Sequence, residues 1–192
     1  MRCSLPKDHQ DEGDGEMLNP WSDVNTSGYL FAGAPLGQTY CNLYWLSRIV
    51  DQYDLKSCFE LGTWYGAFST FLGLHLPTIT ADIKDQRDAH TIELHSRLGV
   101  EFRRADCHDS EVLRGIFADL ERPTLVFCDG ILKEKEFLLM IPFLQSGDII
   151  GVHDVGTEFR PNDPEIVGCI SRSGLSLLES EEASCSMYWM KK

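Results

Sequence analysis

The sequence predicts an α/β protein built on a doubly wound, mostly parallel sheet of seven strands that ends in an antiparallel β-hairpin. Short apolar runs alternate with segments of helical length between residues 57 and 154. Glycines follow the first of these runs, and two further apolar runs close the chain. Strands that alternate with helices indicate a parallel sheet with right-handed crossovers.

The N-terminal third divides into a tail, a loop and a helix. We expect residues 1–24, which are polar and acidic, to form a flexible tail, and residues 25–192 to form one domain. Residues 25–37 resemble an irregular loop that either folds over a pocket or packs on the surface, with Tyr29 and Phe31 as acceptor contacts. A helix is predicted over residues 38–53, because Leu43, Leu46 and Val50 form one apolar stripe.

Five apolar runs predict the parallel strands. They end at Leu61, Asp82, Asp106, Asp129 and Asp154. The runs near Phe59, Val126 and Ile150 are the most apolar and should be central, since parallel strands are buried on both faces. Pro142 should end the helix before the fifth strand. The segments LSLLES, ending at Ser180, and CSMYWM, ending at Met190, predict a hairpin at the sheet edge.

The composition of the chain argues against some classes of binding partner. The net charge is −13, and no cluster of Lys and Arg offers a surface for nucleic acid. No apolar run approaches the roughly 20 residues that cross a bilayer, and the N-terminus lacks the features of a secretory signal. The seven cysteines have no CxxC spacing and are interpreted as thiols of a reducing, cytoplasmic compartment. We therefore expect a small-molecule substrate and no nucleic-acid or membrane partner, and leave a homo-oligomer open.

The first strand leads into the turn Glu60-Leu61-Gly62-Thr63-Trp64-Tyr65-Gly66. Glycines between a strand and a helix allow a tight turn and close ligand approach. Trp64 stands where a dinucleotide-binding pattern has its second glycine, which disfavours a pyrophosphate. A carboxylate at Glu60 suits a cationic ligand, and S-adenosylmethionine (SAM) carries both a sulfonium and an ammonium group. A simple strand-to-helix turn is the alternative.

Two further carboxylates fit the same ligand. Asp82 follows the glycine turn by about 20 residues, where a carboxylate can accept hydrogen bonds from both ribose hydroxyls. Asp106 ends the third run and offers an acceptor for an adenine amine. For both residues the alternative is a helix cap.

Taken together, five segments resemble the successive motifs of class I SAM-dependent methyltransferases, nearest to the small O-methyltransferase group that includes cephalosporin-hydroxylase-like proteins. They are CFELGTWYGAFST, ITADIKD, RRADCHD, VFCDGILKEKEF and SGDIIGVHDV. The resemblance spans roughly residues 38–190 and implies a Rossmann-like fold with SAM as the cofactor. It implies cofactor contacts at Glu60, Gly62, Asp82 and Asp106, and we extend them to Thr63, Trp64, Gly66, Ile83, Cys107 and Asp129.

The predicted activity is transfer of a methyl group from SAM to a small molecule, with a hydroxyl oxygen as the expected acceptor. Hydroxylase-like chemistry on the same fold and a non-catalytic SAM-binding protein are the alternatives. The acceptor itself cannot be read from the sequence, because fold does not fix function.

The catalytic candidates are Asp129, Lys133 and His153. Asp129 and Asp154 end neighbouring strands about 4.8 Å apart, and two such carboxylates repel unless a cation or proton lies between them. They therefore form a candidate site for Mg²⁺ or another divalent cation, the alternative being hydrogen bonds to loop amides or substrate. Lys133 is interpreted as a solvated lysine or a base, and His153 as a rival base. His153 and Asp154 should face opposite sides unless the chain turns there.

Overall fold

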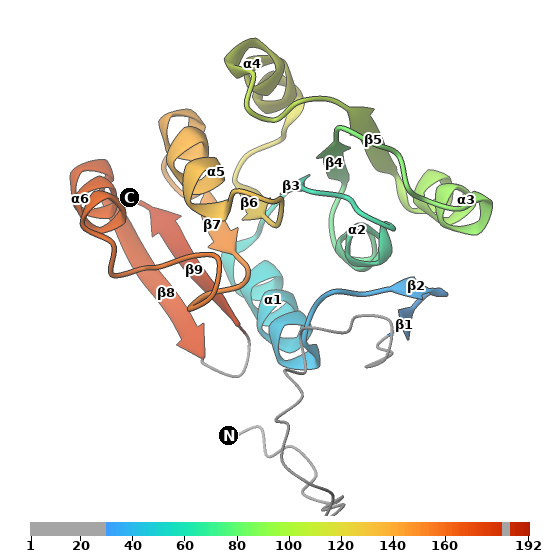
Figure 1. Cartoon of the computed structure of the whole chain (residues 1–192), viewed down its shortest axis with the longest axis horizontal. Helices are drawn as coiled ribbons and strands as arrows, with labels where there is room; N and C mark the ends of the chain where they lie inside the picture. Colours follow the sequence, from blue (N-terminus) through green and yellow to red (C-terminus); the bar gives the residue numbers. More distant parts are fainter. Residues whose placement is uncertain (1–29, 182–184) are drawn as a thin grey trace, which may run out of the picture.

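Seven strands form one sheet in the order β5-β4-β3-β6-β7-β9-β8 in the computed structural model of the chain, which describes residues 30–181 and 185–192 (Figure 1). The first five of these strands run parallel, and β9 is antiparallel to both of its neighbours, β7 and β8. The predicted doubly wound fold and its C-terminal hairpin are therefore confirmed. The predicted tail over residues 1–24 and the candidate contact Tyr29 lie outside the described residues.

The elements follow one another as helices and strands in alternation. The strands are β1 (Leu30–Phe31), β2 (Ala34–Pro35), β3 (Ser57–Leu61), β4 (Thr78–Asp82), β5 (Val100–Arg104), β6 (Thr124–Cys128), β7 (Ile149–Val152), β8 (Leu175–Glu181) and β9 (Ser186–Lys191). The helices are α1 (Tyr40–Tyr53), α2 (Ala67–Gly73), α3 (Ala89–Leu98), α4 (Ser110–Asp119), α5 (Lys133–Met140), the 3₁₀ turn η1 (Ile141–Phe143) and α6 (Pro164–Ser173).

Two apolar cores cover the two faces of the sheet, because side chains alternate along each strand. Phe59 and Val126 pack toward α4, α5 and α6 on one face. Cys58 and Phe127 pack toward α1 and α2 on the other face, and α3 lies beside α2 (Figure 1). The prediction that the runs at Phe59, Val126 and Ile150 are central is confirmed, since β3, β6 and β7 are the three middle strands of the sheet.

A capping side chain and a proline set the ends of two helices, α1 and α5. Thr39 caps α1 by accepting a hydrogen bond from Asn42 N at 3.0 Å. Helix α1 therefore begins at Tyr40, two residues later than predicted, and Gln38 stays on the preceding loop. Helix α5 ends before Pro142, as predicted.

Strand ends differ slightly from the prediction. Leu61 and Asp82 are the last residues of β3 and β4, as predicted, whereas Asp106, Asp129 and Asp154 lie one or two residues beyond β5, β6 and β7. No helix in the described part of the chain combines the length and the apolar character that crossing a membrane requires.

Candidate functional site

A cavity of about 480 Å³ opens at the carboxyl ends of β3, β6 and β7. This edge includes the point between β3 and β6 where the strand order reverses, the usual ligand position in such sheets. Its size lies within the range of small-molecule sites. The glycine turn, the loop before α1 and the loop after β7 line it. The lining residues include Pro35, Leu36, Gly37, Gln38, Glu60, Gly62, Thr63, Trp64, Gly66, Asp129, Lys133, His153, Asp154 and Glu158. The loop over residues 35–38 thus lines a pocket, one of the two roles expected of it.

The glycine turn is held tightly from two sides. Gly62 adopts φ +91°, and a Cβ there would lie 2.6 Å from the carbonyl oxygen of Asp129. Asp82 Oδ2 accepts hydrogen bonds from the backbone N–H groups of Thr63 at 3.1 Å and Trp64 at 3.2 Å. The turn is therefore fixed to the ends of both β6 and β4.

Asp82 and Asp106 both bond to nearby backbone. The second oxygen of Asp82, Oδ1, accepts from Lys84 N, and Asp106 accepts from His108 N. The helix caps that follow are Asp88 and Asp109, so the cap alternative for Asp82 and Asp106 is wrong. Four predicted cofactor contacts, Asp82, Ile83, Asp106 and Cys107, do not line the cavity. Their contact with a cofactor stays a prediction.

Glu60 is buried beneath the turn. Its Oε2 accepts hydrogen bonds from Ser69 Oγ and from Thr80 Oγ1, the latter at 2.6 Å. Burial raises the pKa of Glu60 to about 8, against the opposing effect of those two hydroxyls. The carboxyl group is therefore mostly neutral near pH 7, which differs from the anionic group expected for a cationic ligand.

Replacing Glu60 by glutamine should stabilise the protein at alkaline pH, where the buried carboxyl group of the wild type is ionised, and should have little effect in acid. A raised folded-state pKa means that the wild type loses stability as pH rises from about 4.5 to about 8, while the unfolded chain ionises first. We expect Glu60→Gln to gain on the order of 3 kcal/mol at pH 9 and little at pH 4. Urea unfolding at both pH values measures this, with exposed Glu93→Gln as the control. An equal gain at both pH values would contradict the assignment.

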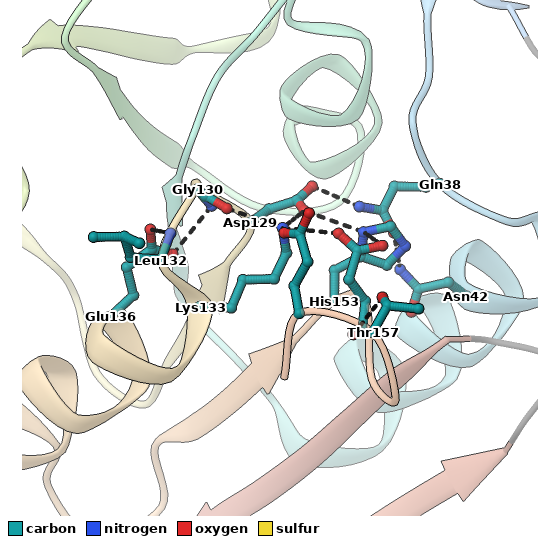
Figure 2. A network of polar contacts seen from close by, with 11 residues as sticks. Gln38, Asn42, Asp129, Gly130, Leu132, Lys133, Glu136, His153 and Thr157 are labelled. Atoms are coloured by element: carbon teal, nitrogen blue, oxygen red, sulfur yellow. Dashed lines mark hydrogen bonds and ion pairs between the residues drawn. The ribbon is translucent and has the colours of Figure 1, made fainter. Parts of the chain in front are cut away.

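The far wall of the cavity holds a cluster of charged side chains (Figure 2). His153 Nδ1 lies 3.1 Å from Asp129 Oδ1 and 3.4 Å from Asp154 Oδ1. Lys133 Nζ lies 2.8 Å from Asp154 Oδ2, 2.8 Å from Glu158 Oε2 and 3.8 Å from Asp129 Oδ1. Three carboxylates against two cations leave the cluster with one net negative charge when both bases are protonated.

Asp154 has a left-handed backbone, with φ +57°. The chain therefore turns just after β7, and the side chains of His153 and Asp154 both lie near Asp129. Side chains alternate along a strand, so His153 and Asp154 could face one site only if the chain turned at this point, as it does.

Both candidate bases hold their protons as the site stands. Burial alone would lower the pKa of His153, but the carboxylates of Asp129 and Asp154 outweigh it and raise the pKa to about 9. Burial also opposes the charge on Lys133, and Asp129, Asp154 and Glu158 outweigh it, so that its pKa rises above the ordinary value. The same two cations hold the pKa of Asp154 well below its usual range, despite burial.

Lys133 is buried, so the interpretation of it as a solvated lysine is wrong. The burial arises because the loop after β7 folds back over α5 and supplies Asp154 and Glu158. Phe31 packs edge-on against Phe71 of α2 at 5.8 Å and does not line the cavity, in contrast to its predicted role as an acceptor contact.

Gln38 and Glu158 are cavity residues that sequence reasoning missed. Gln38 Nε2 donates a hydrogen bond to Asp129 Oδ2 at 2.6 Å. Its position next to the first helix carries no pattern that marks a site. Glu158 lies outside every motif and enters only because the chain turns at Asp154.

The cluster also contains a donor set suited to a divalent cation. One ligand atom each from Asp129, His153 and Asp154 lie within 4.8 Å of one another. Adjacent ligands around a small divalent ion are about 3 Å apart, close to the two distances at His153 Nδ1. Gln38 and Lys133 contact the opposite carboxylate oxygens at 2.6 Å and 2.8 Å, so the donor atoms that face one another are the Oδ1 atoms.

Solved structures with a similar fold include methyltransferases in complex with S-adenosylhomocysteine. CmcI-N160 matches with a TM-score of 0.63 and 15% identity over 98% of this chain and 90% of that one. A structure assigned as a caffeoyl-CoA O-methyltransferase from Staphylococcus aureus matches with a TM-score of 0.59 and 13% identity over 80% and 84%. An O-methyltransferase from Bacillus cereus in complex with S-adenosylhomocysteine (SAH) matches with a TM-score of 0.56 and 16% identity over 80% and 82%.

The chain spans about half of MycE, a methyltransferase solved with Mg and SAH, which matches with a TM-score of 0.55 and 16% identity over 77% of this chain and 48% of that one. Scans of protein-family models and of curated proteins find no match. The chain therefore has the Rossmann-like fold of class I SAM-dependent methyltransferases.

Proposed function

We propose that this protein binds SAM in the cavity beside the glycine turn and transfers its methyl group to a small-molecule acceptor. The observation that carries the proposal is the position of the cavity. It lies at the strand-order reversal of a fold shared with SAM-dependent methyltransferases, between the glycine turn and a cluster with net negative charge. A negative cluster favours a ligand with a sulfonium cation.

The residues of the cavity divide the task. The turn over residues 62–66 brings backbone close to the cofactor, and Trp64 gives the wall an aromatic face. The ring of Trp64 also packs at Gly37, where a Cβ would lie 3.3 Å from it, so the turn and the loop before α1 enclose the cavity together. Enclosure aligns acceptor, methyl carbon and sulfur and excludes water, which is the main requirement of methyl transfer.

We further propose a hydroxyl acceptor. Its oxygen forms the new bond to the methyl carbon while the carbon–sulfur bond breaks, SAH leaves, and the hydroxyl proton passes to solvent. Asp129 and Asp154 accept hydrogen bonds from the acceptor, and Lys133 and His153 hold those carboxylates in place. A divalent cation held by Asp129, His153 and Asp154 would lower the pKa of the hydroxyl.

Thermal unfolding with SAM, SAH and NAD tests the cofactor. SAM and SAH at about 100 times their dissociation constants should stabilise the protein by about 2.7 kcal/mol, and NAD should not. Asp129→Asn should weaken the effect of SAM, whereas Asp163→Asn, which removes the cap carboxylate of the distant helix α6, should leave it unchanged. Absence of any stabilisation by SAM or SAH would overturn the proposal.

Electron paramagnetic resonance of Mn²⁺ tests the cation separately. The wild type should deplete the signal of free Mn²⁺, and Asp154→Asn should not. An undiminished Mn²⁺ signal with the wild type would exclude the cation and leave the carboxylates as acceptors for the substrate hydroxyl.

A further inference from the structure

A buried hydrogen-bond chain connects the site to the first turn of α1 and to β9. Gln38, on the loop before α1, is 2% exposed and donates from Nε2 to Asp129 Oδ2 at 2.6 Å. Asn42, in the first turn of α1, donates from Nδ2 to Gln38 Oε1 at 2.7 Å. Tyr188 of β9 donates from its hydroxyl to Asn42 Oδ1 at 2.5 Å. Figure 2 shows Gln38 between Asn42 and Asp129.

The direction of this chain is fixed at its Asp129 end. An ionised carboxylate only accepts hydrogen bonds, so Gln38 must present its amide nitrogen to Asp129. Its oxygen then faces Asn42, which must donate in turn, and the oxygen of Asn42 faces the Tyr188 hydroxyl. Turning either amide over would place like groups against each other in a buried setting, where unpaired polar groups are costly.

The chain determines which oxygen of Asp129 faces the charged cluster. Oδ2 is taken by Gln38, whereas Oδ1 lies 3.1 Å from His153 Nδ1 and 3.8 Å from Lys133 Nζ. Both carboxylate oxygens of Asp129 therefore face hydrogen-bond donors. Gln38 also lines the cavity, so the same side chain connects the loop before α1 to the charged wall.

We propose that Gln38 is a positioning residue that orients Asp129 toward the bound ligand, and that Asn42 and Tyr188 hold the Gln38 amide in the orientation that donates to Asp129. The proposal rests on the proposed function, because it assigns Asp129 Oδ1 to the cationic ligand. It adds three residues, two of them outside the cavity lining, to those that determine the affinity for SAM.

Calorimetric titration with SAM across pH 5–9 tests the role of Gln38. Gln38→Leu removes the donor that orients Asp129, so it should bind SAM about tenfold more weakly than wild type at every pH, a difference of about 1.4 kcal/mol. Gln38→Glu has the same shape, and its protonated form can donate to Asp129. It should match wild type at low pH and lose about tenfold as it ionises, a profile that a purely structural role would not produce.

Gln52→Glu is the matched control, because Gln52 lies on the exposed surface of α1, the helix that follows Gln38. Its affinity for SAM should equal that of wild type at each pH. Gln38→Leu with wild-type affinity, or Gln38→Glu with a constant ratio to wild type across the pH range, would overturn the role of Gln38.

Nuclear magnetic resonance of the side-chain amides tests the direction of the chain without any ligand. Tyr188→Phe should shift the Gln38 amide resonance, although Asn42 lies between the two residues. The Gln38 signal is assigned by its loss in Gln38→Leu. An unchanged Gln38 resonance in Tyr188→Phe would overturn the directed chain. If the wild type binds no SAM, the proposed function fails, and the amide resonances still decide whether the chain exists.

Discussion

Gly62→Ala is expected to destabilise the protein by about 3 kcal/mol. A left-handed backbone costs a residue with a Cβ about 1–2 kcal/mol, and overpacking adds about 1–3 kcal/mol. Both apply at Gly62, because its φ is +91° and a Cβ would lie 2.6 Å from Asp129 O and 2.9 Å from Gly130 Cα. Neither backbone atom can move without shifting the end of β6. Urea unfolding of the variant measures the loss.

Gly147→Ala separates the two causes. Gly147 has the same φ of +91°, but a Cβ there would meet Pro123 at 3.6 Å, an ordinary contact. We expect this variant to lose only the backbone contribution, about 1–2 kcal/mol. Equal losses in the two variants would show that the close approach of the glycine turn to Asp129 has no energetic weight.

Lys133→Met is expected to destabilise the protein by about 2–3 kcal/mol at pH 7. Removing one partner of a buried ion pair costs about 3–5 kcal/mol, and the partial exposure of Asp154 and Glu158 reduces that cost. Methionine fills a similar volume, so the loss reports on charge. Exposed Lys135→Met, two residues further along the same helix, is the control and should be near neutral.

The deficit of Lys133→Met should also shrink in acid. Lys133 and His153 hold the pKa of Asp154 below its ordinary value of 3.8, which contributes stability above that pH. This contribution is lost as pH falls toward the folded-state value, so wild type and variant should converge below about pH 4. A deficit that stays constant as pH falls from 7 to about 2 would mean that packing, not charge, makes Lys133 important.

Local patterns predicted the fold well because each parallel strand depends on its own apolar run. The runs around Phe59 and Val126 are apolar on both faces and became the centre of the sheet. Single residues set the helix ends. Pro142 ends α5, as the sequence predicted, and Thr39 caps the start of α1. The late start of α1 follows from the Thr39 cap, which a search for apolar periodicity does not detect.

The site was harder to predict because long-range contacts decide the state of its groups. Glu60 was predicted as an anion from its place beside the glycines, but its neutral state follows from burial, which outweighs the hydrogen bonds from Ser69 and Thr80. Lys133 is buried because the chain turns at Asp154 and returns with Glu158. Gln38 and Asp129 are 91 positions apart, and no local pattern connects them.

A crystal structure of the protein soaked with SAH tests the central claim most directly. We expect SAH in the cavity at the carboxyl ends of β3 and β6, in contact with the glycine turn over residues 62–66 and beside Asp129. Such a complex would fix the cofactor and the direction from which the acceptor enters. SAH bound elsewhere, or a cavity left without SAH at saturating concentration, would contradict the account.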